Sequence, residues 1–326
     1  MKNIEKNIFL VSNISKSFYS QVGILESLVD KDIVKPVVVI KDVSLVITRG
    51  ETVGLIGESG SGKTTLAKIM LRLQKPDSGK GTVYFNDNDL SGNVFTLDEK
   101  IFRKKVQMIF QNPDTSLNSQ MTVASLLKEA IKLGNRKISG EQIKTKTEKL
   151  LRDVGIEKRE ILDKKLFEIA GGERRRVGIA RILAINPEFI VADEPIAEID
   201  PDNKTTIISL LQKLKEENAC TFLLISHDLK MIGDTCDRII VMHKGRIIEQ
   251  GLKKDVMGTP KHPYTILLSL RYPLPDKRIL ENEDSFCSFA AYCQEFRPNE
   301  CIFDKLKVID TSDLISHQCV CSKYIC

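Results

Sequence analysis

The stretch GESGSGKTT at residues 57–65 follows the pattern G-x-x-x-x-G-K-[ST]. Glycines at this spacing let backbone N–H groups surround phosphates, Lys63 supplies a charge for the β- and γ-phosphates, and the Thr64 hydroxyl can bind Mg²⁺. A chance glycine-rich turn is the alternative, but an apolar strand-like run precedes the motif and a helical pattern follows it. The candidate contacts are Gly57, Ser59, Gly60, Ser61, Gly62, Lys63, Thr64 and Thr65.

A second acidic element is expected at the end of another buried strand, and FIVADEP supplies it. Asp193 is placed to bind Mg²⁺ directly or through water. Glu194 is one residue further along and can polarise an attacking water. Paired acids at a strand end can also cap a helix, but here the chain continues through Pro195.

His227, in the segment SHDL, closes a third apolar run. A single histidine is usually structural. The carboxyl ends of parallel strands share one edge of a sheet, so we expect His227 at the same edge as the other two elements, in contact with a γ-phosphate.

The segment EIAGGERRRVGIAR, at residues 168–181, has three possible interpretations. It could be a turn before a helix, a basic patch for nucleic acid, or half of a phosphate site. Three adjacent arginines point in three directions around a helix and therefore form no basic stripe. A glycine pair is most often a plain turn, but the N–H groups and positive end of a helix also suit a phosphate.

These motifs need elements to position them. Residues 35–57 are typical of two strands around a glycine turn, and residues 63–73 have helical spacing. Residues 187–193 and 220–226 indicate two more apolar strands, and residues 122–186 indicate several helices. Buried strands alternating with helices predict an α/β fold with a largely parallel sheet.

Composition narrows the class of protein. The chain has 326 residues, 42% of them hydrophobic, and a net charge of +5 that is spread along the sequence, which argues against a nucleic-acid surface. No apolar run approaches the roughly 20 residues that span a bilayer, and the N-terminus lacks the apolar core of a secretory signal. We therefore expect a cytosolic protein. Six of the eight cysteines crowd into the last 40 residues, which suggests metal binding more than disulfides.

Walker A at 57–64, AGGE at 170–173, Walker B with its glutamate at 189–194, and His227 occur in the order typical of one family. Over roughly residues 8–255 the chain resembles the nucleotide-binding subunit of an ABC transporter. The resemblance implies an α/β P-loop NTPase fold of the ABC type, with a mainly parallel core sheet, an antiparallel β subdomain and a helical subdomain at about 112–186. It also implies ATP and Mg²⁺ as cofactors, a nucleotide-binding domain over 1–255 and an extension over 256–326.

Further residues acquire roles only through this resemblance. MIFQNPDTSLN resembles the family's Q-loop, which implies that Gln111 contacts Mg²⁺ or the water and couples to a membrane partner. SKSFYS resembles the aromatic platform for adenine, with Phe18 favoured over Tyr19. AEID resembles the D-loop, in which Asp200 is the best-matched residue.

In the same family the Gly-Gly segment is the signature loop, which completes the ATP site of the opposite subunit. Its expected contacts are Ala170, Gly171 and Gly172. The family usually has Ser where this chain has Ala170, and Gln or a similar residue where it has Arg175. Because identical subunits would carry the missing hydroxyl in both sites, we expect a heterodimer with a second ATP-binding subunit.

The C-terminal extension resembles one branch of the family. KHPYTILLSL, at residues 261–270, could be a short helix, and it resembles the HPYT segment of oligopeptide, dipeptide and nickel importers. There a cysteine-rich tail follows, which implies a [4Fe–4S] cluster, with zinc as the alternative and unliganded thiols as a third interpretation. The expected ligands are Cys287, Cys293, Cys301 and Cys319, and Cys321 and Cys326 keep the assignment open.

The resemblance thus implies the ATPase subunit of an importer for peptides or a related small solute. We expect it at the cytoplasmic face of the membrane, peripheral, with two transmembrane permease subunits, a second ATP-binding subunit and, indirectly, an extracytoplasmic solute-binding protein, but with no nucleic acid. A soluble ABC-type ATPase of DNA repair or translation is the alternative. Such proteins usually have two ATPase domains or a long coiled coil, and this chain shows neither pattern. A small-molecule kinase would leave AGGE and His227 unexplained.

Overall fold

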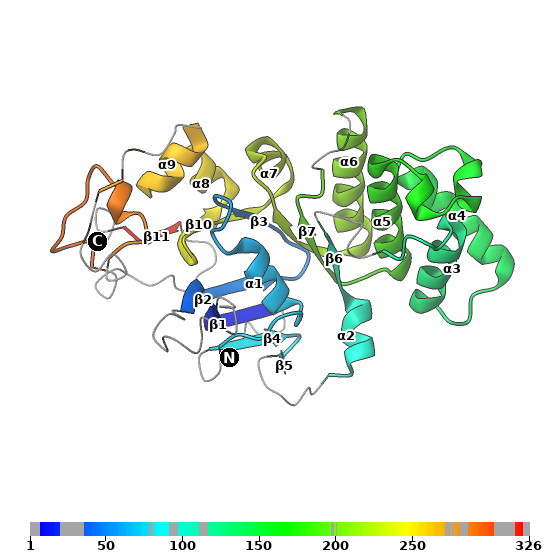
Figure 1. Cartoon of the computed structure of the whole chain (residues 1–326), viewed down its shortest axis with the longest axis horizontal. Coiled ribbons are helices and arrows are strands. Elements are labelled where there is room, and N and C mark those ends of the chain that lie inside the picture. The colour runs from blue at the N-terminus through cyan, green and yellow to red at the C-terminus, as the bar shows by residue number, and fades with distance from the viewer. Residues whose placement is uncertain are drawn as a thin grey trace, which may run out of the picture. The chain divides into compact units, whose positions relative to one another are not determined.

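The computed structural model describes residues 7–19, 36–77, 81–90, 97–110, 117–196, 199, 201–270, 275, 277–278, 280, 286–302 and 317–321. The chain divides into two compact units, and Figure 1 labels their helices and strands. Unit 1 comprises Met1–Thr48, Val53–Thr96 and Cys236–Cys326. Unit 2 comprises Arg49–Thr52 and Leu97–Thr235. The C-terminal extension therefore clusters with the N-terminal strands.

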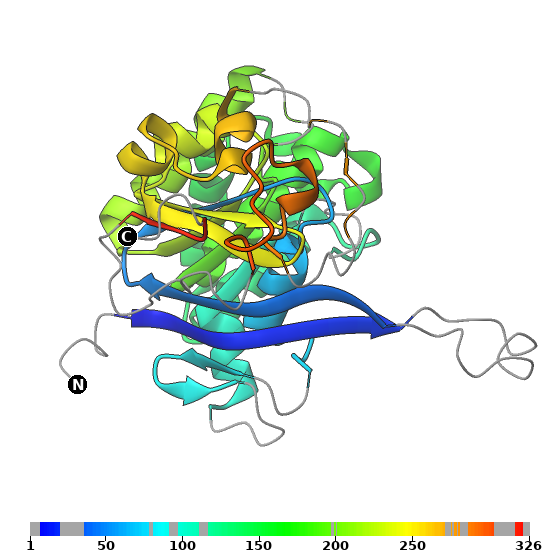
Figure 2. The same ribbon diagram turned by 90° about the vertical axis from the view of Figure 1, so that its left-hand side faces the viewer.

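Unit 1 contains a four-stranded antiparallel sheet with the order β2-β1-β4-β5. Its long hairpin pairs β1 (Asn7–Tyr19) with β2 (Pro36–Thr48), and these two strands run side by side in Figure 2. The short strands β4 (Thr82–Phe85) and β5 (Asn88–Asp89) extend it. Alternating burial along these strands is typical of a sheet with one face on a core.

Four further strands of unit 1 lie in the order β11-β10-β9-β3. The strand β3 (Thr52–Ile56) runs parallel to β9 (Arg238–His243), and β9 forms an antiparallel hairpin with β10 (Arg246–Leu252). The two-residue strand β11 (Gln318–Cys319) pairs with β10 from the chain's end. The helices are α1 (Lys63–Met70), α8 (Lys253–Gly258), α9 (Pro263–Leu270) and the 3₁₀ turn η6 (Ala290–Tyr292).

Unit 2 has three adjacent parallel strands in the order β8-β7-β6. They are β6 (Val106–Ile109), β7 (Phe189–Asp193) and β8 (Thr221–Ile225), and every residue of β7 and β8 is buried, as expected for parallel strands. The helices are α2 (Glu99–Lys105), α3 (Val123–Gly134), α4 (Gly140–Asp153), α5 (Gly171–Ile185), α6 (Pro201–Asn218) and α7 (Leu229–Thr235), with 3₁₀ turns η3 (Arg159–Asp163) and η4 (Leu166–Glu168).

Helices α3, α4 and α5 pack on one another within unit 2 (Figure 1). Local sequence fixes the starts of α3 and α4: the Thr122 side chain caps α3, and Ser139 with Gln142 forms a full capping box on α4. The expected strands near 35–57, 187–193 and 220–226 and the helix after Gly62 are confirmed. Among the described residues, no helix is both long and apolar enough to cross a membrane.

Candidate nucleotide site

The loop between β3 and α1 requires glycine at two positions. Gly57 has φ 148°, and a Cβ there would lie 2.1 Å from the carbonyl oxygen of Met242. Gly62 has φ 100°, and a Cβ there would lie 2.7 Å from the carbonyl oxygen of Val39. Both φ values are costly for other residues. Gly57 and Gly62 are therefore required both because of their φ values and because no space is left for a Cβ atom.

Lys63 folds back over this loop. Its Nζ donates hydrogen bonds to the carbonyl oxygens of Gly57 at 2.8 Å and Glu58 at 2.7 Å, and it lies 3.3 Å from the Ser61 hydroxyl. The α1 helix begins here without a side-chain cap, so the positive end of the helix faces the loop. This arrangement of ammonium, helix end and backbone N–H groups is suited to phosphate.

In unit 2, Glu194 and His227 are brought together at the carboxyl ends of β7 and β8. The Glu194 Oε1 accepts a hydrogen bond from the His227 main-chain N–H at 3.0 Å and lies 2.8 Å from His227 Nδ1. The Ser226 hydroxyl donates to Glu194 Oε2 at 3.1 Å. The Glu194 side chain is only 13% exposed, whereas the His227 side chain is 80% exposed. Both residues can therefore meet a nucleotide from the same edge.

The backbone at Glu194 has an unusual conformation, and hydrogen bonds hold it in place. Its φ of 51° lies in the left-handed region, which is uncommon and costs energy for a residue other than glycine. The Glu194 N–H donates to the Ile225 carbonyl at 2.8 Å, and the buried Arg175 guanidinium donates to the Glu194 carbonyl. Asp193, the residue before, is buried at the end of β7.

The signature residues Ala170, Gly171 and Gly172 form the N-terminus of α5. Ala170 is the N-cap residue and provides no side-chain hydrogen bond to the helix. Ala170 and Gly171 are exposed, and a Cβ added to Gly171 or Gly172 would meet nothing within 4 Å. The N-terminus of α5 is therefore open to an incoming group within unit 2.

Phe18, the second-last residue of β1, is part of an exposed apolar patch. The Phe18 side chain is 36% exposed and Tyr19 is 69% exposed, and across the hairpin Val37 and Val38 are 60% and 50% exposed. Lys16 Nζ lies 5.4 Å from the centre of the Phe18 ring. An exposed aromatic ring with apolar neighbours offers a surface on which a base can stack.

The tail brings several thiols near one another. Burial raises the pKa of the Cys287 thiol to about 12, and Cys321, Cys301 and Cys293 raise it further. Burial also raises the pKa of Cys293, again with contributions from Cys321 and Cys301. The pKa of Cys319 is raised by its hydrogen bond with Cys321 and by burial. Thus Cys321 and Cys301 both neighbour Cys287 and Cys293, and Cys321 also neighbours Cys319.

Among the described residues, no group of three or more His, Cys, Asp and Glu side chains is arranged to hold a metal ion. The donor chemistry itself fits a soft metal, because Cys287, Cys293 and Cys301 from one described segment of the tail neighbour Cys321 from another.

Two expected site residues, Gln111 and Asp200, lie outside the described residues, as does Cys326. Sequence reasoning assigned no role to three residues that the structure places against the motifs: Arg175, Ser226 and Tyr264. The signals available were the position of Ser226 directly before His227 and of Tyr264 within HPYT. No pattern in the sequence indicates that Arg175 faces Glu194.

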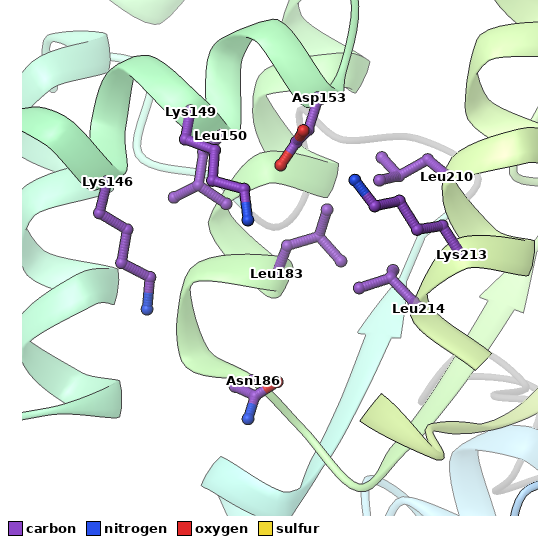
Figure 3. A pocket seen from close by; sticks show the side chains of 9 residues that line it. All are labelled: Lys146, Lys149, Leu150, Asp153, Leu183, Asn186, Leu210, Lys213 and Leu214. Atoms are coloured by element: carbon purple, nitrogen blue, oxygen red, sulfur yellow. The ribbon is translucent and has the colours of Figure 1, made fainter. Parts of the chain in front are cut away.

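A separate cavity of about 320 Å³ lies between α4, α5 and α6 in unit 2. Figure 3 shows Lys149, Lys213 and Asp153 extending toward its middle. Lys146 at its rim donates to the Ala184 carbonyl at 3.0 Å, and burial with the nearby Lys149 lowers the pKa of Lys146. None of the nucleotide motifs lines this cavity.

Comparison with known proteins gives matches over most of the chain. Residues 40–197 match the family model described as ABC transporter. The chain is 39% identical over 237 residues to the oligopeptide transport ATP-binding protein OppF of Bacillus subtilis (strain 168), covering 73% of this chain and 77% of that protein. It is 39% identical over 287 residues to OppF of Streptococcus mutans, covering 87% of each.

Solved structures of the same architecture also match. One is the ATP-binding cassette MJ0796 in a dimeric, post-hydrolysis state bound to ADP and Pi, with a TM-score of 0.63 and 28% identity over 75% of this chain and 98% of that chain. Another is cbiO1 from Clostridium perfringens, with a TM-score of 0.61 and 26% identity over 82% of this chain and 97% of that chain. Together these matches extend across both units.

Proposed function

The chain belongs to the ABC transporter family of ATP-binding proteins, and on that premise we propose that it energises the import of peptides by hydrolysing ATP. It has the cassette fold of that family, mixed α/β with a parallel core sheet and an antiparallel subdomain. The observation that carries the proposal is the contact between Glu194 and His227 at the ends of adjacent parallel strands, in a chain that also has a phosphate-binding loop.

ATP binding is assigned to the loop at 57–65. We propose that the Lys63 ammonium exchanges its carbonyl partners for the β- and γ-phosphates, while the exposed loop N–H groups and the start of α1 bind the remaining oxygens. Phe18 would stack on the adenine, which its exposure at the end of β1 supports.

A bound Mg²⁺ would neutralise charge on the phosphate oxygens. The proposed ligands are Thr64, Asp193 and Gln111, as the family resemblance implies. Thr64 is exposed at the start of α1, and Asp193 ends the buried strand β7, so both positions suit this assignment within their own units. Hydroxyl and carboxylate oxygens are the donors that this hard cation prefers.

Hydrolysis is assigned to Glu194. Its carboxylate would accept a proton from the attacking water, and His227 would hold the carboxylate and contact the γ-phosphate. Three hydrogen-bonding groups, from Ser226 and His227, already fix the two carboxylate oxygens. A base fixed in this way needs little reorganisation at the moment of reaction, which is the main benefit of a preorganised site.

We further propose that the chain works in a heterodimer of ATP-binding subunits at the cytoplasmic face of the membrane. Ala170, Gly171, Gly172 and Asp200 would face the partner's nucleotide, and the absence of a serine hydroxyl at Ala170 would leave that second site slow. One missing hydrogen bond to a charged group is worth roughly 1.5–3 kcal/mol, or about 10- to 100-fold in rate. Two permease subunits and, indirectly, a solute-binding protein complete the importer.

The cysteine tail is proposed to bind a [4Fe–4S] cluster, with zinc as the alternative. Cys287, Cys293, Cys301 and Cys319 are the ligands expected from the sequence. Their electrostatic neighbours support Cys321 rather than Cys319 in the fourth position. Thiolates are the usual ligands of such clusters.

Peptide uptake by the assembled transporter tests the proposed function. Cells or vesicles that carry the chain with the permeases from its neighbouring genes should take up a labelled peptide in an ATP-dependent manner, and Lys63→Ala should abolish this uptake. If the wild-type chain hydrolyses ATP but supports no uptake and instead purifies with nucleic acid or ribosomes, the soluble-ATPase alternative replaces the proposal.

A further inference from the structure

A hydrogen bond joins the phosphate-binding loop to the C-terminal extension. The Glu58 N–H donates to the Tyr264 hydroxyl at 2.8 Å. Tyr264 is the second residue of α9 and is only 1% exposed, while the loop tip at Glu58, Ser59 and Gly60 is exposed. Burial raises the pKa of the Tyr264 phenol, and a phenol oxygen can accept this N–H while its own hydrogen stays in place.

Glu58, whose N–H bonds to Tyr264, also accepts hydrogen bonds within the phosphate-binding loop. The Glu58 carbonyl accepts hydrogen bonds from Lys63 Nζ at 2.7 Å and from the Ser61 N–H at 3.1 Å. Glu58 is thus bonded through its N–H to the extension and through its carbonyl to the lysine and the turn. A shift of its backbone would move the groups that we assign to the phosphates.

Tyr264 is itself fixed from several sides within unit 1. Its ring centre lies 4.5 Å from that of His243 in β9 and 5.5 Å from that of Phe289 in the cysteine tail. Its N–H donates to His262 Nδ1 at 3.1 Å, and the His262 N–H donates to Glu249 at 2.9 Å. The hydroxyl therefore has one well-defined position.

The cysteine tail contacts both His262 and Tyr264. His262 Nε2 lies 3.4 Å from the Cys287 sulfur, and Phe289 packs against both His262 and Tyr264. His262, Phe289 and Tyr264 are each about 1% exposed. Between Cys287 and the phosphate-binding loop there is thus a continuous series of buried contacts.

We infer that Tyr264 is a positioning residue for the phosphate-binding loop, and that through it the cysteine tail sets the affinity of the chain for ATP. The inference rests on the proposed ATP site. A residue that positions the loop alike in the ground state and the transition state should change nucleotide affinity and leave the rate of the bound complex unchanged.

The full-length Tyr264→Phe variant tests this, because it keeps the buried ring and removes only the acceptor. The dissociation constant for a fluorescent, non-hydrolysable ATP analogue with Mg²⁺ should rise about 3- to 10-fold, the equivalent of one lost hydrogen bond. The kcat of the assembled transporter should stay near the wild-type value. The matched control is Tyr292→Phe, which alters a tail tyrosine that stacks on Phe289, and it should bind like wild type.

A second variant tests the link to the tail. Phe289→Leu keeps the Tyr264 hydroxyl but loosens the ring, so it should weaken binding by a smaller factor and add little in the Tyr264→Phe background. If Tyr264→Phe and Phe289→Leu lower only the melting temperature while the dissociation constant stays at the wild-type value, the contact is packing alone and the inference is overturned. If the wild-type chain itself fails to bind the analogue, the proposed ATP site is what fails.

Discussion

Arg175, in the second turn of α5, donates a hydrogen bond to the main-chain carbonyl of Glu194. The helix that begins at the signature glycines is thereby bonded to the residue that we assign as the base. Because Glu194 has a φ of 51°, its carboxylate direction depends on the groups that hold its backbone. An arginine in place of the family's usual residue at this position therefore has a definite structural partner.

Replacing Arg175 should impair hydrolysis more than binding. Arg175→Met keeps the length of the side chain but removes the donor, so Glu194 should leave its preorganised position. We expect kcat to fall roughly 10-fold or more, with ATP affinity close to wild type. Arg176→Met is the matched control, since Arg176 bonds the carbonyls of Val154 and Gly155 instead. Equal losses of kcat in both variants would contradict a specific role for Arg175.

Glu194→Gln should keep ATP binding and remove most hydrolysis, by about 10²- to 10⁴-fold, because an amide is a poor acceptor for the proton of water. The amide oxygen can still accept from the His227 N–H, so the local structure should persist. His227→Ala should be strongly impaired alone but add little in the Glu194→Gln background, since residues that act as a unit are not additive. Single-turnover hydrolysis measures both effects. If the losses of rate in the two single variants add fully in the double variant, Glu194 and His227 act independently.

Ala170→Ser should stabilise α5 and speed the site that it faces. A serine at this N-cap would accept a hydrogen bond from the first turn, which is worth about 0.5–2 kcal/mol in the free energy of unfolding. Ser139→Ala, which removes the capping box of α4, should lower stability by a similar amount and leave hydrolysis unchanged. Thermal unfolding and ATPase rates of both variants check this. A lower melting temperature for Ala170→Ser would contradict the prediction.

The two ATP sites of the assembled importer should differ. Lys63→Ala disables the phosphate-binding loop proposed for this chain and should abolish transport. Substitution of the corresponding lysine in the partner subunit should reduce hydrolysis much less, because that site would depend on Ala170. Transport and ATPase assays on each single variant decide the matter. Equal losses, or an active homodimer of this chain, would rule out the asymmetric model.

Protein purified without oxygen should contain iron and sulfide and absorb broadly near ~400 nm, as thiolate-bound clusters do. Serine at Cys287, Cys293, Cys301 or Cys321 should lose the iron, whereas Cys319→Ser should retain most of it. Cys220→Ser is the control, because Cys220 is a buried thiol of unit 2. Iron lost with Cys319 but not Cys321 would restore the assignment that the family resemblance implies, and zinc without iron would favour the alternative metal.

Spacing alone predicted the elements around the motifs. The apolar runs that became β3, β7 and β8 are uninterrupted and short, and each leads into polar residues, so their type and ends could be inferred. The strands β9 and β10 were not predicted, although nearly all of their residues are buried, because arginine, histidine, glutamate and glutamine interrupt the apolar pattern. Their polar side chains are buried with partners that come from distant parts of the chain, such as His317 at Glu249.

The sequence by itself determined which groups the candidate site contains: a glycine-rich loop suited to phosphate, a carboxylate after a buried strand, and a histidine after the next strand. These depend on residue types at short spacing, which local backbone geometry and hydrogen bonding impose. Only the tertiary structure decided which groups restrain them. Arg175 meets Glu194 across 19 positions, and Tyr264 meets Glu58 across 206. Such contacts follow from how helices and strands pack, and packing distances are not encoded in any local pattern.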